Sequence, residues 1–508
     1  MTTATGELGE ILRSSFERFR TLPALWLGGE YCSYGQLFAA AVKTGAALLQ
    51  DTDPGERVAI LAQHSFPAYV GVLASILSGR PYVPINMKFP LERQLYIVSA
   101  SNCSRIISDS YSKRRCGELL ERVGSKLREV SVAPPEDNPP AVDFSGGEAK
   151  PGLAYVMFTS GTTGTPKGVA VRRDNVASYL QAIRKIVPLE PGTRCTQLFD
   201  LSFDLSVHDL LHTWASGGCL YVMGNEEALD PVGFAQQHGL QSWFSVPSVV
   251  AMARRLNRLM PAVLPEMQFS LFCGEPLPFS IAEEWSKVAP NSRLFNLYGP
   301  TEATIAITAQ EFVPSQWGAG RPATVPLGEP FENCAALVVD EAGKPAMSGE
   351  LWLGGAQISD GYVNNKEEDK KKFVEARLPG YSYERWYRTG DVVRTDEKYG
   401  LIFEGRIDHQ VKIQGYRIEL LEIEEVLRRA SGSPEAAAVP WPLTESGSAE
   451  GVVAFVGTSA KTERQIIDFC RSLLPGYMTP RRIFFVDKLP LNANGKVDRN
   501  ALRQMLAH

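Results

Sequence analysis

The sequence predicts an α/β fold: a large N-terminal domain with two α/β subdomains and a β-rich subdomain, then a small, mobile α+β C-terminal domain. Three observations lead to this prediction. The chain has 508 residues, too many for a single compact hydrophobic core. Short apolar runs alternate with helical patterns in its first half, as they do in largely parallel sheets. After about residue 330, short strands between glycine- and aspartate-containing turns replace that pattern.

The expected elements follow in chain order. The first half should contain strands at 57–61, 82–85, 105–109, 153–158 and 219–223, and a helix at 67–77. The β-rich subdomain, about 330–407, should contain strands at 335–340, 349–354 and 400–405. We expect the large domain to cover residues 1–407 and the small lid domain residues 408–508, with the hinge at Asp408. The small domain should contain a helix at 418–427, a strand at 451–456 and an amphipathic helix at 463–474.

Composition and charge exclude several classes of protein. Hydrophobic residues make up 44% and charged residues 21% of the chain, and the net charge of -5 is that of an ordinary soluble protein. Basic residues form no arm or face, so we expect no nucleic-acid partner. No apolar run reaches about 18 residues and no signal-peptide pattern is present, so we expect no membrane insertion and a cytoplasmic location. The eight cysteines include no CxxC pair, which argues against zinc and for reduced thiols.

The strongest single motif runs from Phe158 to Val169, directly after an expected strand. Its glycines, hydroxyl residues and lysine form a flexible loop that can donate many hydrogen bonds to phosphate oxygens. It is not a Walker loop, because Pro166 precedes the lysine and Gly168 follows it, where that loop has glycine and a hydroxyl residue. The alternative interpretation is an ordinary surface turn.

Six motifs in a fixed order carry a resemblance to a known family. They are Ser160–Gly168, Tyr298–Glu302 (YGPTE), Gly349–Leu351 (GEL), Tyr387–Asp391 (YRTGD), Gly405–Asp408 (GRID) with Lys412, and Asn494–Arg499 (NGKVDR). Together they resemble the adenylate-forming superfamily, which includes acyl-CoA synthetases, luciferases and nonribosomal-peptide adenylation domains. The likeness spans roughly residues 31–502, nearly the whole chain.

The resemblance implies an enzyme that uses ATP and Mg²⁺. A carboxylate oxygen has to attack the α-phosphorus of ATP, so the site must bring cations and hydrogen-bond donors to two anions. Glu302 would bind Mg²⁺ and Thr301 would contact the α-phosphate. Tyr298 would lie against adenine, Asn296 would bind its exocyclic amine, and Asp391 would bind the ribose. The phosphate loop would contribute Thr159, Ser160, Gly161, Thr162, Thr163, Gly164 and Lys167. Purely structural roles are the alternative for these residues.

Mobile cations are expected to distinguish two half-reactions. Lys496 resembles the lysine that moves onto the substrate carboxylate and the α-phosphate for adenylation, and a long flexible cation suits that task. Arg406 would reach the ribose or phosphate from the hinge. Lys412, just beyond the hinge, would serve a second orientation of the small domain, in which a thiol attacks the adenylate. An ordinary surface lysine is the alternative at position 412.

The acid to be activated is expected to be a small α-amino acid. Asp204 occupies the position where amino-acid activators of the family keep a carboxylate for the α-ammonium, and a buried aspartate needs such a cation. A turn-capping aspartate is the alternative. The resemblance assigns the remaining pocket positions to Leu205, His208, Ser245, Leu271, Cys273, Gly274, Leu297, Ile305 and Ala306. These residues leave room for a small neutral side chain.

A narrower resemblance favours alanine. The segment Ser270–Glu275 (SLFCGE) is similar to D-alanine–carrier-protein ligases, but His208 stands where those enzymes usually have methionine. A histidine there could pair with a polar substrate side chain or merely fill the same volume, and the enantiomer stays open. The expected reaction is aminoacyl-AMP formation with release of pyrophosphate, then transfer to the phosphopantetheine thiol of a separate carrier protein, because no carrier-domain serine motif is present. A small thiol such as coenzyme A is the alternative acceptor.

Two other functions compete with this hypothesis. One is an acyl-CoA synthetase acting on a non-amino carboxylic acid. Such an enzyme would share the motifs, but it would have no ammonium group for Asp204 to bind. A catalytically idle ligand-binding homologue would have no need of the phosphate loop, Glu302, Asp391 and Lys496, all of which are present.

Overall fold

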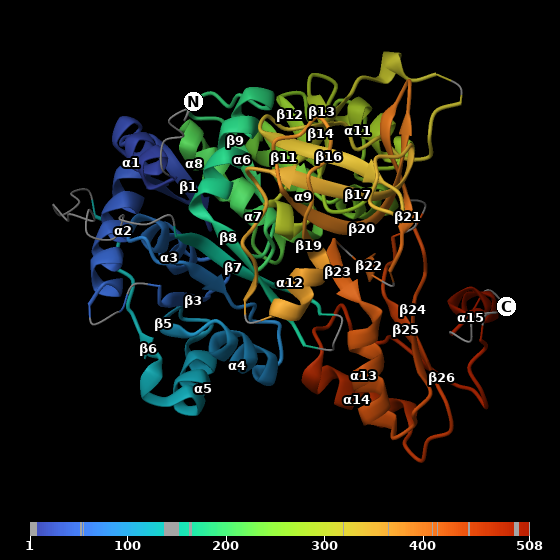
Figure 1. Cartoon of the computed structure of the whole chain (residues 1–508). Coiled ribbons are helices and arrows are strands. Elements are labelled where there is room, and N and C mark those ends of the chain that lie inside the picture. The colour runs from blue at the N-terminus through green and yellow to red at the C-terminus, as the bar shows by residue number, and fades with distance from the viewer. Residues whose placement is uncertain are drawn as a thin grey trace.

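The computed structural model describes residues 8–50, 53, 55–136, 152–161, 165–318, 320–363, 365–408, 410–413, 415–444, 448–491 and 497–506. Two large sheets and a five-stranded sheet form the large domain, and a smaller α+β unit lies beside them (Figure 1). The predicted fold class is therefore confirmed. The domain boundary at Asp408 stays a prediction.

The first α/β subdomain is built on a seven-stranded sheet in the order β18-β8-β7-β4-β3-β5-β6. Its strands are β3 (Arg57–Leu61), β4 (Tyr82–Pro84), β5 (Cys103–Ser108), β6 (Arg128–Glu129), β7 (Leu153–Thr159), β8 (Lys167–Arg172) and β18 (Gly361–Val363). The strands from β7 to β6 are parallel, and β8 pairs antiparallel with β7. The apolar run of β3 is buried on both faces, which explains its continuous hydrophobic pattern.

The second α/β subdomain contains a nine-stranded sheet in the order β15-β14-β13-β12-β11-β9-β10-β1-β2. Its strands are β1 (Pro23–Leu27), β2 (Glu30–Ser33), β9 (Arg194–Gln197), β10 (Cys219–Val222), β11 (Ser242–Ser245), β12 (Phe269–Phe272), β13 (Arg293–Tyr298), β14 (Thr308–Phe312) and β15 (Glu329–Pro330). The strands from β1 to β13 are parallel, and those at the two edges are antiparallel.

Helices join the two large sheets into one hydrophobic core. The core contains Ile60 and Tyr155 of one sheet and Leu220 and Phe244 of the other, together with side chains from the first helices. The helices of the large domain are α1 (Leu8–Arg18), α2 (Tyr34–Leu48), α3 (Phe66–Leu77), α4 (Leu91–Ala100), α5 (Lys113–Val123), α6 (Arg173–Ile186), α7 (Leu205–Val207), α8 (Thr213–Ser216), α9 (Pro231–His238), α10 (Pro247–Arg255), α11 (Phe279–Val288) and α12 (Lys366–Lys372). No helix in the described part of the chain is long and apolar enough to cross a membrane.

The β-rich subdomain forms a five-stranded antiparallel sheet in which β20 pairs with three neighbours. Its strands are β16 (Cys334–Val339), β17 (Ser348–Gly355), β19 (Phe373–Glu375), β20 (Arg385–Asp396) and β21 (Gly400–Arg406). The expected strands at 335–340, 349–354 and 400–405 overlap β16, β17 and β21.

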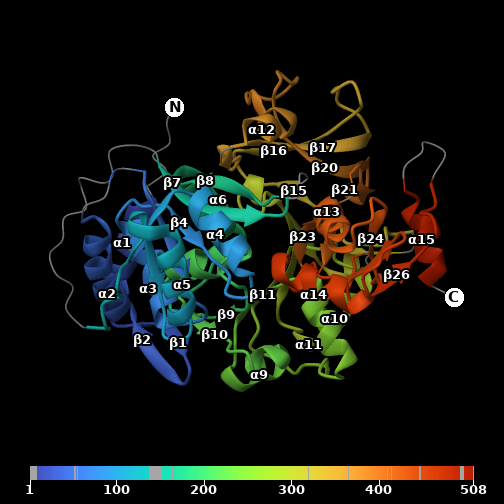
Figure 2. The same ribbon diagram turned by 90° about the horizontal axis from the view of Figure 1, so that it is seen from below.

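The small domain begins with a hairpin and continues as a three-stranded sheet covered by helices. Its elements are β22 (Gln410–Ile413), β23 (Tyr416–Glu419), α13 (Leu420–Ser431), β24 (Ala436–Pro440), β25 (Val452–Val456), α14 (Glu463–Leu473), β26 (Ile483–Phe485) and α15 (Arg499–Leu506). The expectation of a helix from Ile418 is wrong at its start, because Ile418 and Glu419 belong to β23. Figure 2 shows β23 and α13 on the side of the small domain that faces the large domain, and α15 on the outer side.

Candidate active site

A cavity of about 80 Å³ lies where the two domains meet. It is lined by residues that follow the carboxyl ends of β7, β12 and β13, including Ser160, Gly274 and Thr301, and by Arg417 and Tyr477 of the small domain. Ligands of open α/β sheets bind outside the carboxyl ends of the strands, so the topology alone favours this position. Ten predicted site residues line the cavity: Thr159, Ser160, Asp204, Leu205, Gly274, Tyr298, Thr301, Asp391, Arg406 and Lys412.

The predicted phosphate loop connects two antiparallel strands, β7 and β8. A Walker loop leads from a strand into a helix, so the sequence-based distinction between the two loops is confirmed. Gly161 is required by space, because a Cβ there would lie 1.8 Å from the Thr165 carbonyl oxygen. Thr159 Oγ1 and Lys167 Nζ are buried without a hydrogen bond in the described part of the chain, as suits a site for anionic oxygens. The Lys167 ammonium lies 3.6 Å from a carboxylate oxygen of Glu368. Thr162, Thr163 and Gly164 lie outside the described residues.

One end of the cavity presents an aromatic ring, a carboxylate and a guanidinium. The Tyr298 hydroxyl donates to Asp391 Oδ2 at 2.5 Å, and Arg406 pairs with the other oxygen of Asp391. Arg406 also holds Asp408 through two hydrogen bonds of 2.7 Å. Asn296 does not line this cavity but a smaller one of about 20 Å³, which Tyr298 also lines. Its side-chain nitrogen donates to two backbone carbonyls, which leaves its side-chain oxygen as an acceptor. This end can hold a flat base and a ribose.

Glu350 fixes the part of strand β20 that carries Asp391. Its carboxylate accepts hydrogen bonds from the Gly390 amide at 3.0 Å and from the guanidinium of Arg388. The Thr389 hydroxyl donates to the Leu351 carbonyl and accepts from the Asp391 amide. The sequence motif at Gly349–Leu351 is thereby explained: it shapes the backbone under the expected ribose ligand.

Thr301 and Glu302 lie in a tight turn after β13, followed by strained backbone. Thr304 and Ile305 have positive φ angles of 58° and 73°, which are unfavourable for β-branched residues. The buried side chain of Gln357 clamps this segment by donating to the carbonyls of Ala303, Thr304 and Ala306, and the Gln357 backbone carbonyl accepts from the Thr304 hydroxyl. Strain of this kind persists only where the surroundings enforce it, and here it fixes the direction of Glu302.

Asp204 also lines the cavity. Its carboxylate is 7% exposed and has no ion pair in the described part of the chain. Burial raises the pKa of this carboxyl to about 7, although a hydrogen bond from the Thr301 hydroxyl counteracts that shift. A buried carboxylate that faces a cavity, without an ion-pair partner among the described residues, is arranged for a positively charged ligand.

The other predicted pocket residues divide into two groups. Leu205 and Gly274 line the cavity beside Asp204. Seven do not line it and are buried in the core: His208, Ser245, Leu271, Cys273, Leu297, Ile305 and Ala306. His208 Nδ1 shares a hydrogen bond of 2.6 Å with the Tyr179 hydroxyl, and burial lowers the pKa of its imidazole well below the usual value. The ring of His208 is therefore held by the core.

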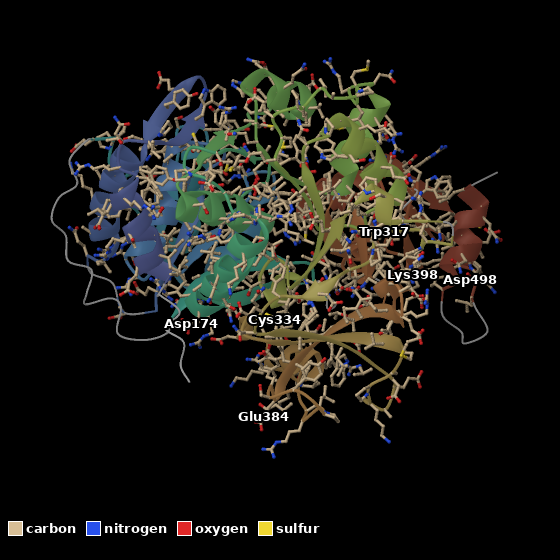
Figure 3. All side chains as sticks on the ribbon, turned by 90° about the horizontal axis from the view of Figure 1, so that it is seen from above. Asp174, Trp317, Cys334, Glu384, Lys398 and Asp498 are labelled. Carbon is tan, nitrogen blue, oxygen red and sulfur yellow. The ribbon has the colours of Figure 1, made fainter. Side chains whose placement is uncertain are left out.

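The small domain contributes one of the two predicted lysines. Lys412 on β22 lines the cavity, and burial lowers the pKa of its ammonium group although Asp391 and Cys273 counteract the shift. Lys496 lies outside the described residues. Its nearest described neighbours lie on the outer side of the small domain, where Val497 bridges to Leu491 and Asp498 stands beside α15 (Figure 3).

Comparison with known proteins decides the family. The model of the AMP-binding enzyme family matches residues 12–363, and the model of the AMP-binding enzyme C-terminal domain matches residues 422–496. The chain belongs to the AMP-binding enzymes. Among its relatives, the D-alanine–D-alanyl carrier protein ligase of Bacillus licheniformis is 30% identical over 493 residues, which cover 94% of each chain. Bacitracin synthase 3 of Bacillus licheniformis is 32% identical over 88% of this chain and 7% of its own length.

Solved structures agree with this assignment. The Vibrio cholerae adenylation domain AlmE, in complex with glycyl-adenosine-5'-phosphate, superposes with a TM-score of 0.87 and 34% identity over 99% of this chain and 98% of AlmE. Holo-PA1221, an NRPS protein with adenylation and PCP domains, gives a TM-score of 0.83 and 25% identity over 98% and 84% of the two chains. This AMP-binding enzyme is an adenylate-forming ligase and uses ATP.

Several residues of the AMP-binding enzyme site were missed from the sequence. Gln357 and Arg417 act through hydrogen bonds to backbone or to other side chains, and single polar residues within strands or loops give no pattern that predicts such contacts. Glu350 lies in the GEL motif, but the sequence did not predict its contact with the Gly390 amide. The hairpin β22–β23 did leave a signal. Val411, Ile413, Tyr416 and Ile418 alternate with polar residues around a glycine, which is typical of two short strands and a turn.

Proposed function

We propose that this adenylate-forming ligase activates a small neutral α-amino acid, glycine or alanine, and transfers the aminoacyl group to the phosphopantetheine thiol of a carrier protein. The observation that carries the proposal is Asp204, a buried carboxylate that faces the cavity without an ion-pair partner in the described part of the chain. An α-ammonium would supply the missing cation, whereas a carboxylic acid without an amine would leave the buried charge unpaired.

The size of the cavity supports a small side chain. Beyond Asp204 the wall consists of Leu205 and Gly274, and a Cβ at Gly274 would already lie 3.1 Å from Val246. The predicted pocket residues that do not line the cavity are buried, and Tyr179 holds His208 in place. A glycyl adenylate is the ligand of the similar AlmE structure, and D-alanine is named for the Bacillus licheniformis ligase.

A second, larger groove supports a thiol substrate. It encloses about 690 Å³ between α10 and the small domain, and its lining includes Arg255, Arg481 and Glu275. At its inner end Glu275 accepts a hydrogen bond from the Gly415 amide at 2.7 Å, and Gly415 also lines the cavity with Asp204. A long, slender arm that enters this groove would reach the aminoacyl end of an adenylate, and the arginines suit the phosphate at the base of a phosphopantetheine.

The two predicted lysines fit two steps of this reaction. Lys412 lies in the cavity in the present orientation of the small domain, so we assign it to the transfer step. Lys496 is assigned to the adenylation step, in which the small domain takes another orientation.

A divalent cation fits the adenylation step. Glu302 offers a fully buried carboxylate, the hard oxygen donor that Mg²⁺ prefers. The Thr159 hydroxyl and the Lys167 ammonium, neither of which has a hydrogen bond in the described part of the chain, belong to the adjacent phosphate loop. Glu302 would hold Mg²⁺ there, and the bound ion would neutralise phosphate charge during adenylation.

A substrate panel tests the proposal. ATP–pyrophosphate exchange would be measured with glycine, both enantiomers of alanine and serine, larger amino acids, and propionate as an acid without the amine. We expect glycine or one alanine enantiomer to give the fastest exchange and propionate to give none. Fastest exchange with propionate or with an aromatic amino acid would overturn the proposal. Transfer to a phosphopantetheinylated carrier protein, compared with coenzyme A, tests the second step.

A further inference from the structure

Helix α12 contains one buried carboxylate, although all seven of its residues are charged. Asn365 caps the helix by accepting a hydrogen bond of 3.2 Å from the Glu368 amide, and the acids of the first turn and the lysines of the last turn suit the helix dipole. These local features explain why the segment is helical, but not why Glu368 is only 7% exposed. A carboxylate is rarely buried without a cation beside it, so Glu368 needs a partner outside the helix.

That partner is Lys167, the lysine of the phosphate loop. A carboxylate oxygen of Glu368 lies 3.6 Å from Lys167 Nζ, and both side chains are almost fully buried. The fold brings the two together through β18, which pairs with β8 and leads into α12. Glu302 forms its own ion pair with Arg417, at 3.0 Å. Among the described residues, Glu368 is therefore the ion-pair partner of Lys167.

The ammonium group of Lys167 keeps its hydrogen-bond donors free. At 3.6 Å its contact with Glu368 is an ion pair and not a hydrogen bond, and Nζ makes no hydrogen bond in the described part of the chain. Nζ also lies over the Tyr362 ring, 4.7 Å from its centre, in a cation–π contact that uses no donor. Asp369, next to Glu368 on α12, fixes Tyr362 by accepting from its amide at 2.7 Å. Helix α12 thus balances the charge of Lys167 and leaves its three N–H groups for an anionic ligand.

Other cations lie close to this position and would repel an uncompensated lysine. Lys372, one turn further along α12, lies 3.7 Å from a carboxylate oxygen of Asp408. Burial lowers the pKa of the Lys372 ammonium, and the positive charges of Arg417 and Lys167 lower it further. Without Glu368, Lys167 would be a buried cation among like charges, which favours displacement of its side chain from the phosphate loop.

We propose that Glu368 is a positioning residue for ATP: it holds the Lys167 ammonium beside the phosphate loop, with its N–H groups free to bind the β- and γ-phosphates. Glu368 itself then touches neither the nucleotide nor a metal ion and acts only through Lys167. The inference rests on the proposed function only in the assignment of Lys167 to the phosphates of ATP. It is independent of which amino acid is activated and of the carrier protein.

Nucleotide affinity separates this role from a purely structural one. Binding of AMP, and of ATP with Mg²⁺, to the full-length protein would be measured by isothermal titration calorimetry without an amino acid. In Glu368→Gln we expect the affinity for ATP to fall about tenfold and the affinity for AMP to stay within about twofold, because only ATP carries the phosphates that Lys167 would bind. Glu368→Asp retains the negative charge and should restore part of the affinity for ATP.

A double-mutant cycle tests whether Glu368 acts through Lys167. Lys167→Met should itself weaken ATP binding by at least about tenfold and leave AMP binding nearly unchanged. In the Lys167→Met protein the further change Glu368→Gln should have little additional effect, since the group that Glu368 positions is already missing. Independent, multiplicative losses of ATP affinity in the double variant would overturn the inference.

Glu367→Gln is the matched control, because Glu367 is the neighbouring acid of α12 and is exposed, and this variant should bind both nucleotides as the wild type does. In ATP–pyrophosphate exchange, Glu368→Gln should raise KM for ATP about tenfold and leave KM for the amino acid unchanged. Wild-type affinity for ATP in Glu368→Gln, or an equal loss of AMP and ATP affinity, would overturn the inference.

The same measurements distinguish failure of the inference from failure of the proposed function. Wild-type affinity for ATP in Lys167→Met would overturn the inference together with the assignment of the phosphate loop. Absence of exchange with every amino acid in the wild type, with ATP binding intact, would count only against the proposed amino-acid substrate.

Discussion

The Tyr298 hydroxyl donates a hydrogen bond of 2.5 Å to Asp391, and this contact joins strand β13 of the nine-stranded sheet to strand β20 of the β-rich sheet. The expected adenine platform and the expected ribose ligand are therefore one unit, although 93 residues separate them in the chain.

Tyr298→Phe tests whether this hydrogen bond orients the ribose ligand. The ring would remain, but Asp391 would lose one of its two partners, and we expect KM for ATP to rise about fivefold, as for the loss of about 1 kcal/mol. The measurement is ATP–pyrophosphate exchange at varied ATP. Tyr381→Phe, at a partly exposed position of the β-rich region, is the control. An unchanged KM for ATP in Tyr298→Phe would show that the ring alone matters.

Asp204→Asn should remove recognition of the amino acid. Loss of the anion opposite the α-ammonium should lower kcat/KM for the amino acid by about two to three orders of magnitude, while KM for ATP changes little. Asp174→Asn, a surface carboxylate on α6 (Figure 3), serves as the control. Full activity of Asp204→Asn would contradict the assignment of Asp204 to the ammonium group.

The pKa of Asp204 predicts a pH dependence. Because the carboxylate must be ionised to bind an ammonium group, kcat/KM for the amino acid should fall as the pH drops below about 7. The stability of the ligand-free protein should change with pH in the opposite direction. The folded-state pKa lies above the ordinary value of 3.8, so the ligand-free protein loses stability as the pH rises between 3.8 and about 7. Asp204→Asn should therefore have a higher Tm than the wild type at pH 8, measured by calorimetry without ligands.

Gln357→Ala tests the clamp on the strained turn. The carbonyls of Ala303, Thr304 and Ala306 would lose a buried donor, and we expect the free energy of unfolding to fall by about 2 kcal/mol and adenylation to slow because Glu302 is no longer held. Urea denaturation and exchange assays measure the two effects. Gln316→Ala, at an exposed position, should change neither. Loss of stability without loss of exchange would separate the clamp from Glu302.

The two lysines predict opposite defects. Lys496→Ala should abolish ATP–pyrophosphate exchange and largely spare transfer from a preformed adenylate, whereas Lys412→Met should slow transfer more than exchange. The physical reason is that each cation serves a different orientation of the small domain. Single-turnover assays of both half-reactions on both variants check this. If both variants lost the same half-reaction, the assignment of the lysines to two orientations would be wrong.

Local sequence patterns were sufficient for much of the fold. Strands such as Arg57–Leu61 are continuous buried apolar runs, and α14 begins with a Thr462–Gln465 capping box, so each element is predicted by its own residues. The prediction of a helix from Ile418 was wrong at its start because pairing with another strand, and not the local sequence, decides the structure there. Its first residues are polar and apolar in turn, and only pairing with β22 makes them a strand.

The sequence by itself determined the α/β class, the phosphate loop and the residue types of the site, because strand patterns, glycine placement and motif order are properties of local segments. Tertiary structure decided which of those residues meet. Asp204 and Lys412 line the same cavity, whereas His208 is buried in the core and shares a hydrogen bond with Tyr179. Tertiary structure also set Arg417 on Glu302, 115 residues away. Contacts of this kind depend on how domains and sheets dock, and docking is set by the summed burial of many side chains rather than by any one segment.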